Sequence, residues 1–113
     1  MWAVSMRERL RSRFLRLMTI AGHHLERKRR WKSAVAIYQK ALEAEDLREE
    51  FYQRLMVCHR ELGNRADALA VYERCRARLS GTLDIAPSPT TEAIRTELRG
   101  SITVTGASRP SET

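Results

Sequence analysis

The chain has 113 residues and a net charge of +7, with 31% charged and 6% aromatic residues. This length predicts one domain with one modest core, and the scarcity of Gly and Pro favours a helical protein. Two cysteines inside helical patterns do not make a disulfide framework, and neither a membrane span nor a secretory signal is recognisable, so we expect a cytoplasmic protein without a membrane partner.

The first predicted helix, about residues 3–28, carries the basic charge. Residues 1–32 contain ten Lys and Arg against two acids, whereas residues 33–113 contain eleven basic and twelve acidic residues. The predicted core-facing stripe consists of Leu10, Phe14, Leu17, Ala21 and Leu25. The opposite side carries Arg9, Arg13 and Arg16. This arginine row is either a phosphate-binding site for nucleic acid or a solvated face, and the missing interleaved aromatics favour the solvated face.

The apolar stripe of this helix continues to the N-terminus through Trp2, Met6 and Leu10. Exposed apolar ends of this kind usually meet another domain or chain. We therefore expect a protein contact at this end of the helix.

A repeat of 34 residues follows, visible when residues 18–46 are aligned with 52–80. Small and aromatic residues recur in register as the pairs Ala34/Ala68, Tyr38/Tyr72 and Ala41/Cys75. Thirty-four residues is the length of a tetratricopeptide (TPR) unit, and the A-x3-F spacing of its second helix is present in both copies. The pattern predicts antiparallel hairpins with helices at about 31–44, 47–62 and 65–80.

The turns between these helices carry capping signals. Asp46 with Glu49 reads as a capping box for the third helix. Gly63 reads as a left-handed residue that ends this helix, and Asn64 as the N-cap of the next.

The stretch "LDIAPSPTTEAIRTEL", residues 83–98, predicts a last helix at about 89–99. Ser88 can cap it and Pro89 suits its first position. Ile94 and Leu98 are expected to cover the apolar end of the second hairpin. Residues 100–113 are expected to form a disordered polar tail. Two repeats and a cap are fewer than a free-standing solenoid needs, so further residues or oligomerisation, such as a homodimer, are expected.

In a TPR arrangement the first helices of the hairpins line one shared surface. The register places seven residues on it, namely Arg16, Thr19, His23, Arg27, Gln53, Val57 and Arg60. This basic and polar groove is either a site for an acidic or carboxylate-bearing peptide or the solvated side of the stack.

Catalytic signatures are not found in the sequence. Adjacent His23 and His24 diverge by about 100° on a helix and are poorly placed to share a metal, and the same holds for Cys58 and His59. Neither a Gly-rich phosphate loop nor a nucleophile elbow appears. No enzyme activity, metal or cofactor is expected.

Three segments together resemble the bacterial transcriptional activator domain, the TPR-like module of SARP-type transcriptional regulators. They are "WAVSMRERLRSRFLRLM", "WKSAVAIYQKALEAEDLREEFYQRLM" and "LGNRADALAVYERCRARLSGTLDIAPSPTTEAIRTEL". The resemblance covers about Trp2 to Leu98, so residues 1–99 look like the C-terminal portion of such a domain and 100–113 like a tail. It implies a non-catalytic regulatory and signalling domain that binds protein partners and meets DNA only through a winged-helix domain.

The expected partners are that winged-helix domain, a second copy, or the transcription machinery. Two alternatives remain open at this stage. The chain could be a generic TPR-like adaptor or oligomerisation module outside transcription, or it could bind nucleic acid directly through the basic first helix.

Overall fold

The computed structural model describes the backbone of residues 2–112 and the side chains of residues 4–100. This range contains five α-helices and no strand, and none of its helices is both long and apolar enough to cross a membrane. The helices are α1 (Trp2–Arg27), α2 (Trp31–Ala44), α3 (Glu49–Glu61), α4 (Arg65–Arg78) and α5 (Pro89–Glu112), with a π-helical turn, η1 (Leu79–Leu83), after α4. The predicted all-α, TPR-like fold is confirmed, and the bounds predicted for the first four helices differ from the observed ones by two residues at most.

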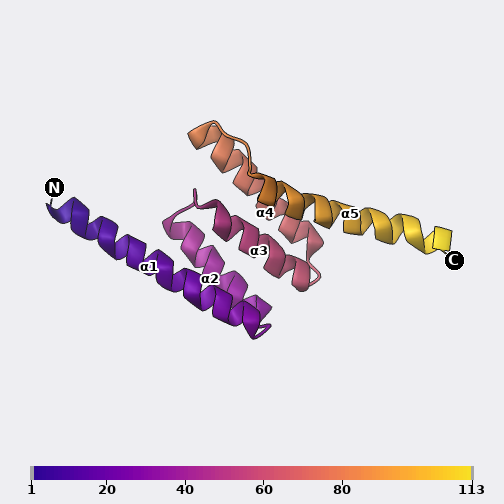
Figure 1. Cartoon of the computed structure of the whole chain (residues 1–113), viewed down its shortest axis with the longest axis horizontal. Helices are drawn as coiled ribbons and strands as arrows, with labels where there is room; N and C mark the ends of the chain where they lie inside the picture. Colours follow the sequence, from indigo (N-terminus) through magenta and orange to yellow (C-terminus); the bar gives the residue numbers. More distant parts are fainter. Residues whose placement is uncertain (1, 113) are drawn as a thin grey trace.

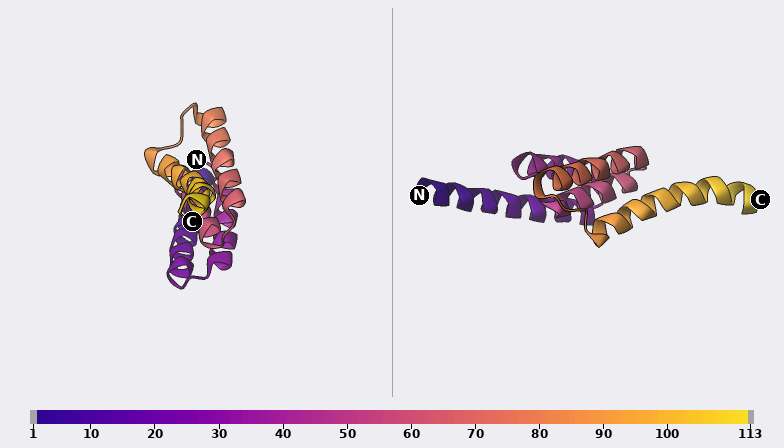
Figure 2. Two further views of the ribbon diagram at one scale, coloured as in Figure 1. Left: turned by 90° about the vertical axis from the view of Figure 1, so that its right-hand side faces the viewer. Right: turned by 90° about the horizontal axis from the view of Figure 1, so that it is seen from above.

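The first four helices form two antiparallel hairpins that lie side by side in chain order (Figure 1). α5 packs on α3 and α4 of the second hairpin. The N-terminal part of α1 and the C-terminal part of α5 extend beyond this body at opposite ends (Figure 2). The molecule is therefore long and flat, with extents of 66 × 35 × 17 Å.

The repeated residues form the core, as the 34-residue period predicted. Ala34, Tyr38 and Ala41 of α2 are fully buried, and so are their counterparts Ala68 and Cys75, with Tyr72 only 5% exposed. Phe51, at the start of α3, packs on Tyr38 with ring centroids 6.2 Å apart. Large side chains of this kind contribute roughly 1.5–3 kcal/mol each when buried, so the interface between the hairpins is the main source of stability.

Small residues set the distance between α1 and α2. Gly22 of α1 is buried, and a Cβ placed on it would lie 2.6 Å from Cε1 and Oη of Tyr38. The tyrosine ring therefore lies directly on the backbone of α1. Only glycine permits this approach, because real Cβ atoms do not come so near other atoms.

Two hairpin turns share one geometry, at positions 34 residues apart. After α3, the amide of Gly63 bonds the carbonyl of Arg60 and that of Asn64 bonds the carbonyl of His59. After α1, the amides of Arg29 and Arg30 bond the equivalent carbonyls in the last turn of the helix. These are Schellman motifs, which need a left-handed residue; Gly63 has φ +80° and Arg29 has φ +58°. The prediction for Gly63 is confirmed, and the first turn uses an arginine in the same role.

The predicted N-caps of α3 and α4 are wrong in their side chains. Arg48, not Asp46, is the N-cap of α3, and it makes no side-chain cap bond. Asp46 instead pairs with Arg78 at 2.9 Å, since the chain between α2 and α3 turns toward the end of α4. Asn64 does hold the N-cap position of α4 but forms no cap bond with its side chain.

α5 begins as predicted. Ser88 is its N-cap, with its carbonyl accepting from the amide of Glu92 at 3.0 Å, and Pro89 is its first residue. Leu98 is fully buried in the core and Ile94 packs against it. These two residues cover the open end of the second hairpin.

The end of α5 differs from the prediction. Helical backbone continues to Glu112, where we expected an end near residue 99 and then a disordered tail. Gly100 suggested a stop, but a glycine that ends a helix adopts a positive φ, and in the described part of the chain Gly63 is the only glycine that does. The side chains of residues 101–113 lie outside the described residues, and disorder of this tail stays a prediction.

The predicted stripe of α1 is only partly correct. Leu15 is its most buried apolar residue, at 3% exposure, with Phe14, Met18 and Leu25 packed against the core. Leu10 and Leu17 are 57% and 61% exposed. The helix has a second apolar strip on its outer side, and a periodicity count alone could not tell the two apart.

Gly22→Ala is expected to lower the free energy of unfolding by about 1–3 kcal/mol, because the added methyl group overpacks the contact with Tyr38. Urea denaturation followed by circular dichroism measures it. Gly81→Ala is the matched control, since nothing lies within 4 Å of its added Cβ, and it should be neutral or slightly stabilising. Equal stability of Gly22→Ala and the unmodified chain would contradict the close approach.

Arg29→Gly is expected to raise the free energy of unfolding by about 1 kcal/mol, because a left-handed non-glycine residue costs about 1–2 kcal/mol. The reverse change at the equivalent turn, Gly63→Ala, should lower it by a similar amount. Thermal melts of both variants test the pair. A lower melting temperature for Arg29→Gly would show that the arginine side chain stabilises the turn.

Candidate partner-binding groove

α1 and α3, the first helices of the two hairpins, lie on either side of a shallow surface hollow. Its lining consists of His23, Glu26, Arg27, Glu50, Gln53 and Arg54. We call these six residues the central hollow. They come from the last turns of α1 and the first turns of α3, so the hollow exists only when both hairpins are docked.

A cluster of three polar side chains closes the floor of the central hollow. Tyr38 Oη donates to Glu26 Oε2 at 2.6 Å, and Arg54 Nε donates to the same oxygen at 3.0 Å. Arg54 Nη2 also donates to Glu26 Oε1. The carboxylate thus joins α1, α2 and α3 through a forked arginine contact, which is a strong and directional arrangement.

The ionisation of this cluster follows from burial and pairing. Burial raises the pKa of the Glu26 carboxyl, but hydrogen bonds from Arg54 and Tyr38 outweigh it and hold the pKa below its ordinary value. The bond to Glu26 raises the pKa of Arg54. Burial and the same carboxylate raise the pKa of Tyr38 far above its ordinary value. At neutral pH the cluster is therefore a carboxylate, a guanidinium and a neutral phenol.

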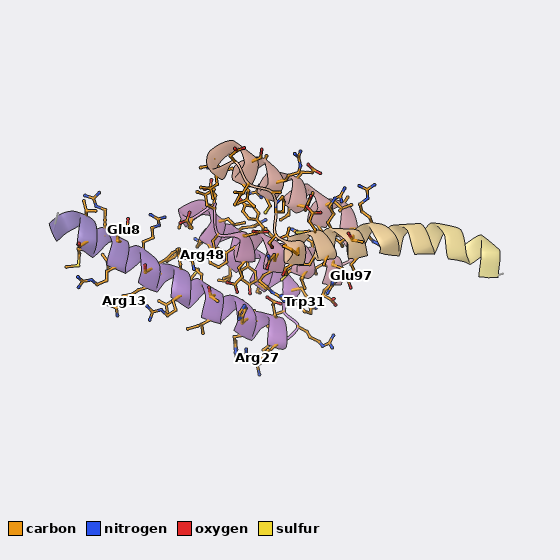
Figure 3. All side chains as sticks on the ribbon, turned by 45° about the horizontal axis from the view of Figure 1, so that its top comes forward. Glu8, Arg13, Arg27, Trp31, Arg48 and Glu97 are labelled. Carbon is orange, nitrogen blue, oxygen red and sulfur yellow. The ribbon has the colours of Figure 1, made fainter. Side chains whose placement is uncertain are left out.

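The charge of the central hollow is mixed rather than basic. His23 Nε2 lies 3.7 Å from Glu50 Oε2, and Glu26 neutralises Arg54. Arg27 is exposed at the rim (Figure 3) and forms no ion pair with any side chain in residues 4–100. Among the arginines of the hollow, Arg27 is thus the one available to a carboxylate outside the chain.

α5 occupies the other part of the predicted groove. Gln53 Nε2 donates to Thr91 Oγ1 at 2.9 Å, and Arg60 Nη1 donates to Glu97 Oε1 at 2.8 Å. Val57, between them on α3, is half-buried. The chain itself therefore fills the surface that α3 would otherwise offer to a peptide.

Glu49 fixes the start of α5. Its Oε2 accepts the backbone amide of Ser88 at 2.7 Å and also the hydroxyl of Thr91, which is fully buried. This contact replaces the local capping box predicted at Asp46. The carboxylate that a capping box takes from within the helix comes here from a residue 39 positions earlier.

The structure thus brings together three of the seven predicted groove residues, His23, Arg27 and Gln53. Arg16 lies on the outer side of α1, and Thr19 donates its hydroxyl to the carbonyl of Leu15 at 3.0 Å. Sequence reasoning missed Glu26, Glu50 and Arg54, because acids on a helix surface are usually solvated and nothing local marks them as a cluster.

The arginine row of α1 lies on the outer side of that helix. Arg9, Arg13 and Arg16 are exposed, and none forms an ion pair within residues 4–100. Figure 3 shows Arg13 pointing away from the other helices. Whether nucleic acid binds there stays a prediction.

The thiols and histidines do not assemble a reactive centre in the described residues. Burial raises the pKa of Cys58 and of Cys75 to about 12, so both are protonated and unreactive at neutral pH. Within the part that the structure describes, no three His, Cys, Asp or Glu side chains are close enough to hold a metal ion.

Two docked helical hairpins with a capping helix and a small polar hollow define a TPR-like helical domain. Comparison with known proteins makes this more specific: the model of the bacterial transcriptional activator domain matches residues 1–99. The chain belongs to this family, so it is a regulatory domain from the group of transcription activators. Searches of curated proteins and of solved structures gave no match.

Glu26→Gln is expected to lower the free energy of unfolding at pH 7 by about 1–3 kcal/mol, because it weakens the bonds to Arg54 and Tyr38. The folded-state pKa of Glu26 is lowered, so its contribution is present above the unfolded pKa and is lost as the pH falls through the folded value. The difference between the two proteins should therefore shrink between about pH 5 and pH 3.

Denaturation curves at a series of pH values measure this difference. Glu73→Gln is the matched control, since Glu73 is exposed and pairs only with Arg76 on its own helix. It should change stability by less than about 0.5 kcal/mol at every pH. A pH-independent gap for Glu26→Gln would show that lost packing rather than lost charge causes the effect.

Proposed function

We propose that the chain is a non-catalytic protein-binding domain of a bacterial cytoplasmic transcriptional regulator, and that DNA is bound by a separate winged-helix domain. The match to the family model over residues 1–99 is the observation that carries this proposal. The fold is consistent with it, because hairpin stacks of this type present side chains on rigid helices over a continuous surface.

The central hollow is the proposed contact site for the regulatory partner. Arg27 at its rim supplies a cation without a partner among the described side chains, and His23 stands opposite Glu50. A carboxylate from an acidic peptide can reach Arg27 without breaking the Glu26–Arg54 pair. Arg60 no longer belongs to this proposal, since it pairs with Glu97 of α5.

A reporter assay tests the proposed function. The chain is fused to an unrelated DNA-binding domain, and transcription is measured from a promoter that carries its operator in a bacterial host. We expect the fusion to raise transcription several-fold above that of the DNA-binding domain alone, and the double change His23→Ala with Arg27→Ala to remove most of the gain.

Arg99→Ala, an exposed arginine on α5, is the matched control and should leave the gain intact. Circular dichroism of the isolated variants confirms that they remain folded. A fusion that never raises transcription would favour the generic adaptor or oligomerisation module. A gain that survives the double change would remove the central hollow from the proposal and leave the function in place.

A further inference from the structure

The outer side of α1 carries a row of exposed apolar side chains. Their spacing alternates between four and three residues, as in a helix seam that packs against another helix. The row consists of Met6, Leu10, Arg13, Leu17 and Ile20, and its four apolar members are 40%, 57%, 61% and 57% exposed in chain order. We call these five residues the α1 strip.

The internal repeat shows what covers the same face in the second unit. At an offset of 34 residues Leu17 corresponds to Phe51, and His24 corresponds to Cys58. Both counterparts on α3 are fully buried, and Phe51 lies against Tyr38 of α2. A second-type helix therefore covers this face of α3, whereas no helix in the described chain covers the face of α1.

The other end of the stack is already closed. Tyr72 Oη of α4 donates to Glu92 of α5 at 2.6 Å, and Leu98 is buried beneath α5. The face of α4 that would meet a following hairpin is thus unavailable. A second copy cannot cover the α1 strip with its α4 in the way that α2 covers α3.

Charge indicates the chemistry of the helix that fits the α1 strip. α1 contains six arginines and only two glutamates. Glu8 lies 3.8 Å from Arg11, and Glu26 is bound to Arg54. Arg13 and Arg16 line a small hollow together with Leu17 and Ile20, so cations border the apolar side chains.

Two α1 helices packed face to face would place these arginines against one another, and like charges at an interface oppose association. An acidic helix is complementary. Carboxylates beside its apolar residues would meet the arginine row while the apolar residues cover Leu10, Leu17 and Ile20.

We propose that the α1 strip binds an amphipathic helix with acidic flanks from a partner protein, laid on α1 as α2 is laid on α3. From Met6 to Ile20 the strip is about 21 Å long, so the bound helix has roughly four turns. This inference rests on the proposed function, because it names a surface and a chemistry for the protein partner of the domain.

The test uses a labelled synthetic peptide based on α2, which covers the equivalent face of α3. Its sequence is that of residues 31–45 with Lys32→Glu and Lys40→Glu, and the unaltered sequence serves as the second probe. Fluorescence anisotropy with the full chain is expected to show at least tenfold tighter binding of the acidic peptide, and the difference should shrink at high salt.

Variants of the chain locate the site. Leu17→Asp and Arg13→Glu are each expected to weaken binding of the acidic peptide at least tenfold. Ile85→Asp is the matched control, because Ile85 is 50% exposed and lies outside the strip, and it should leave binding unchanged. Thermal melts confirm that the variants fold, as expected for exposed positions.

Four results would overturn the proposal: equal affinity for the two peptides, binding that survives Leu17→Asp, a dimer in sedimentation that Leu17→Asp dissociates, or a DNA duplex bound through Arg13 but not through Leu17. The dimer would assign the strip to a second copy, and the duplex result would assign the arginine row to nucleic acid.

The reporter assay separates this inference from the proposed function. If the fusion activates transcription but the acidic peptide does not bind, only the α1 strip is wrongly assigned. If the peptide binds through the strip but the fusion never activates, the proposed function fails while the strip remains a helix-binding surface.

Discussion

The contact of Tyr38 with Gly22 and Glu26 is the constraint on which the rest of the structure depends. The ring lies on the backbone of α1 at Gly22, and its hydroxyl reaches Glu26. The same carboxylate holds Arg54 of α3. One tyrosine thus sets the spacing within the first hairpin and the position of the second. The central hollow follows directly, since Glu26 and Arg54 form its floor.

The residues that repeat every 34 positions were predictable because helix packing fixes their type. Ala34 and Ala41 must be small and Tyr38 must be large wherever one hairpin stacks on another. Helix bounds followed from the same period and from the turn at Gly63. The family likewise followed from these segments together with the stretch at residues 83–98.

The polar contacts were not predictable, because each joins residues distant in sequence. Glu26 and Arg54 meet only through the crossing of α1 and α3, and Glu49 reaches Ser88 across 39 positions. Local rules assigned Glu49 to a capping box and Arg60 to an open groove. α1 raised a different difficulty, since it has two apolar strips and the repeat covers only one of them within the chain.

The closed end at α5 and the open face of α1 make the domain directional. Identical subunits that stack head to tail by the hairpin contact must each offer both faces, and such contacts produce open filaments when they do not form rings. Here α5 fills one face through Leu98 and the Glu49 contact to Ser88. The domain can therefore terminate a helical stack but cannot propagate one by this contact.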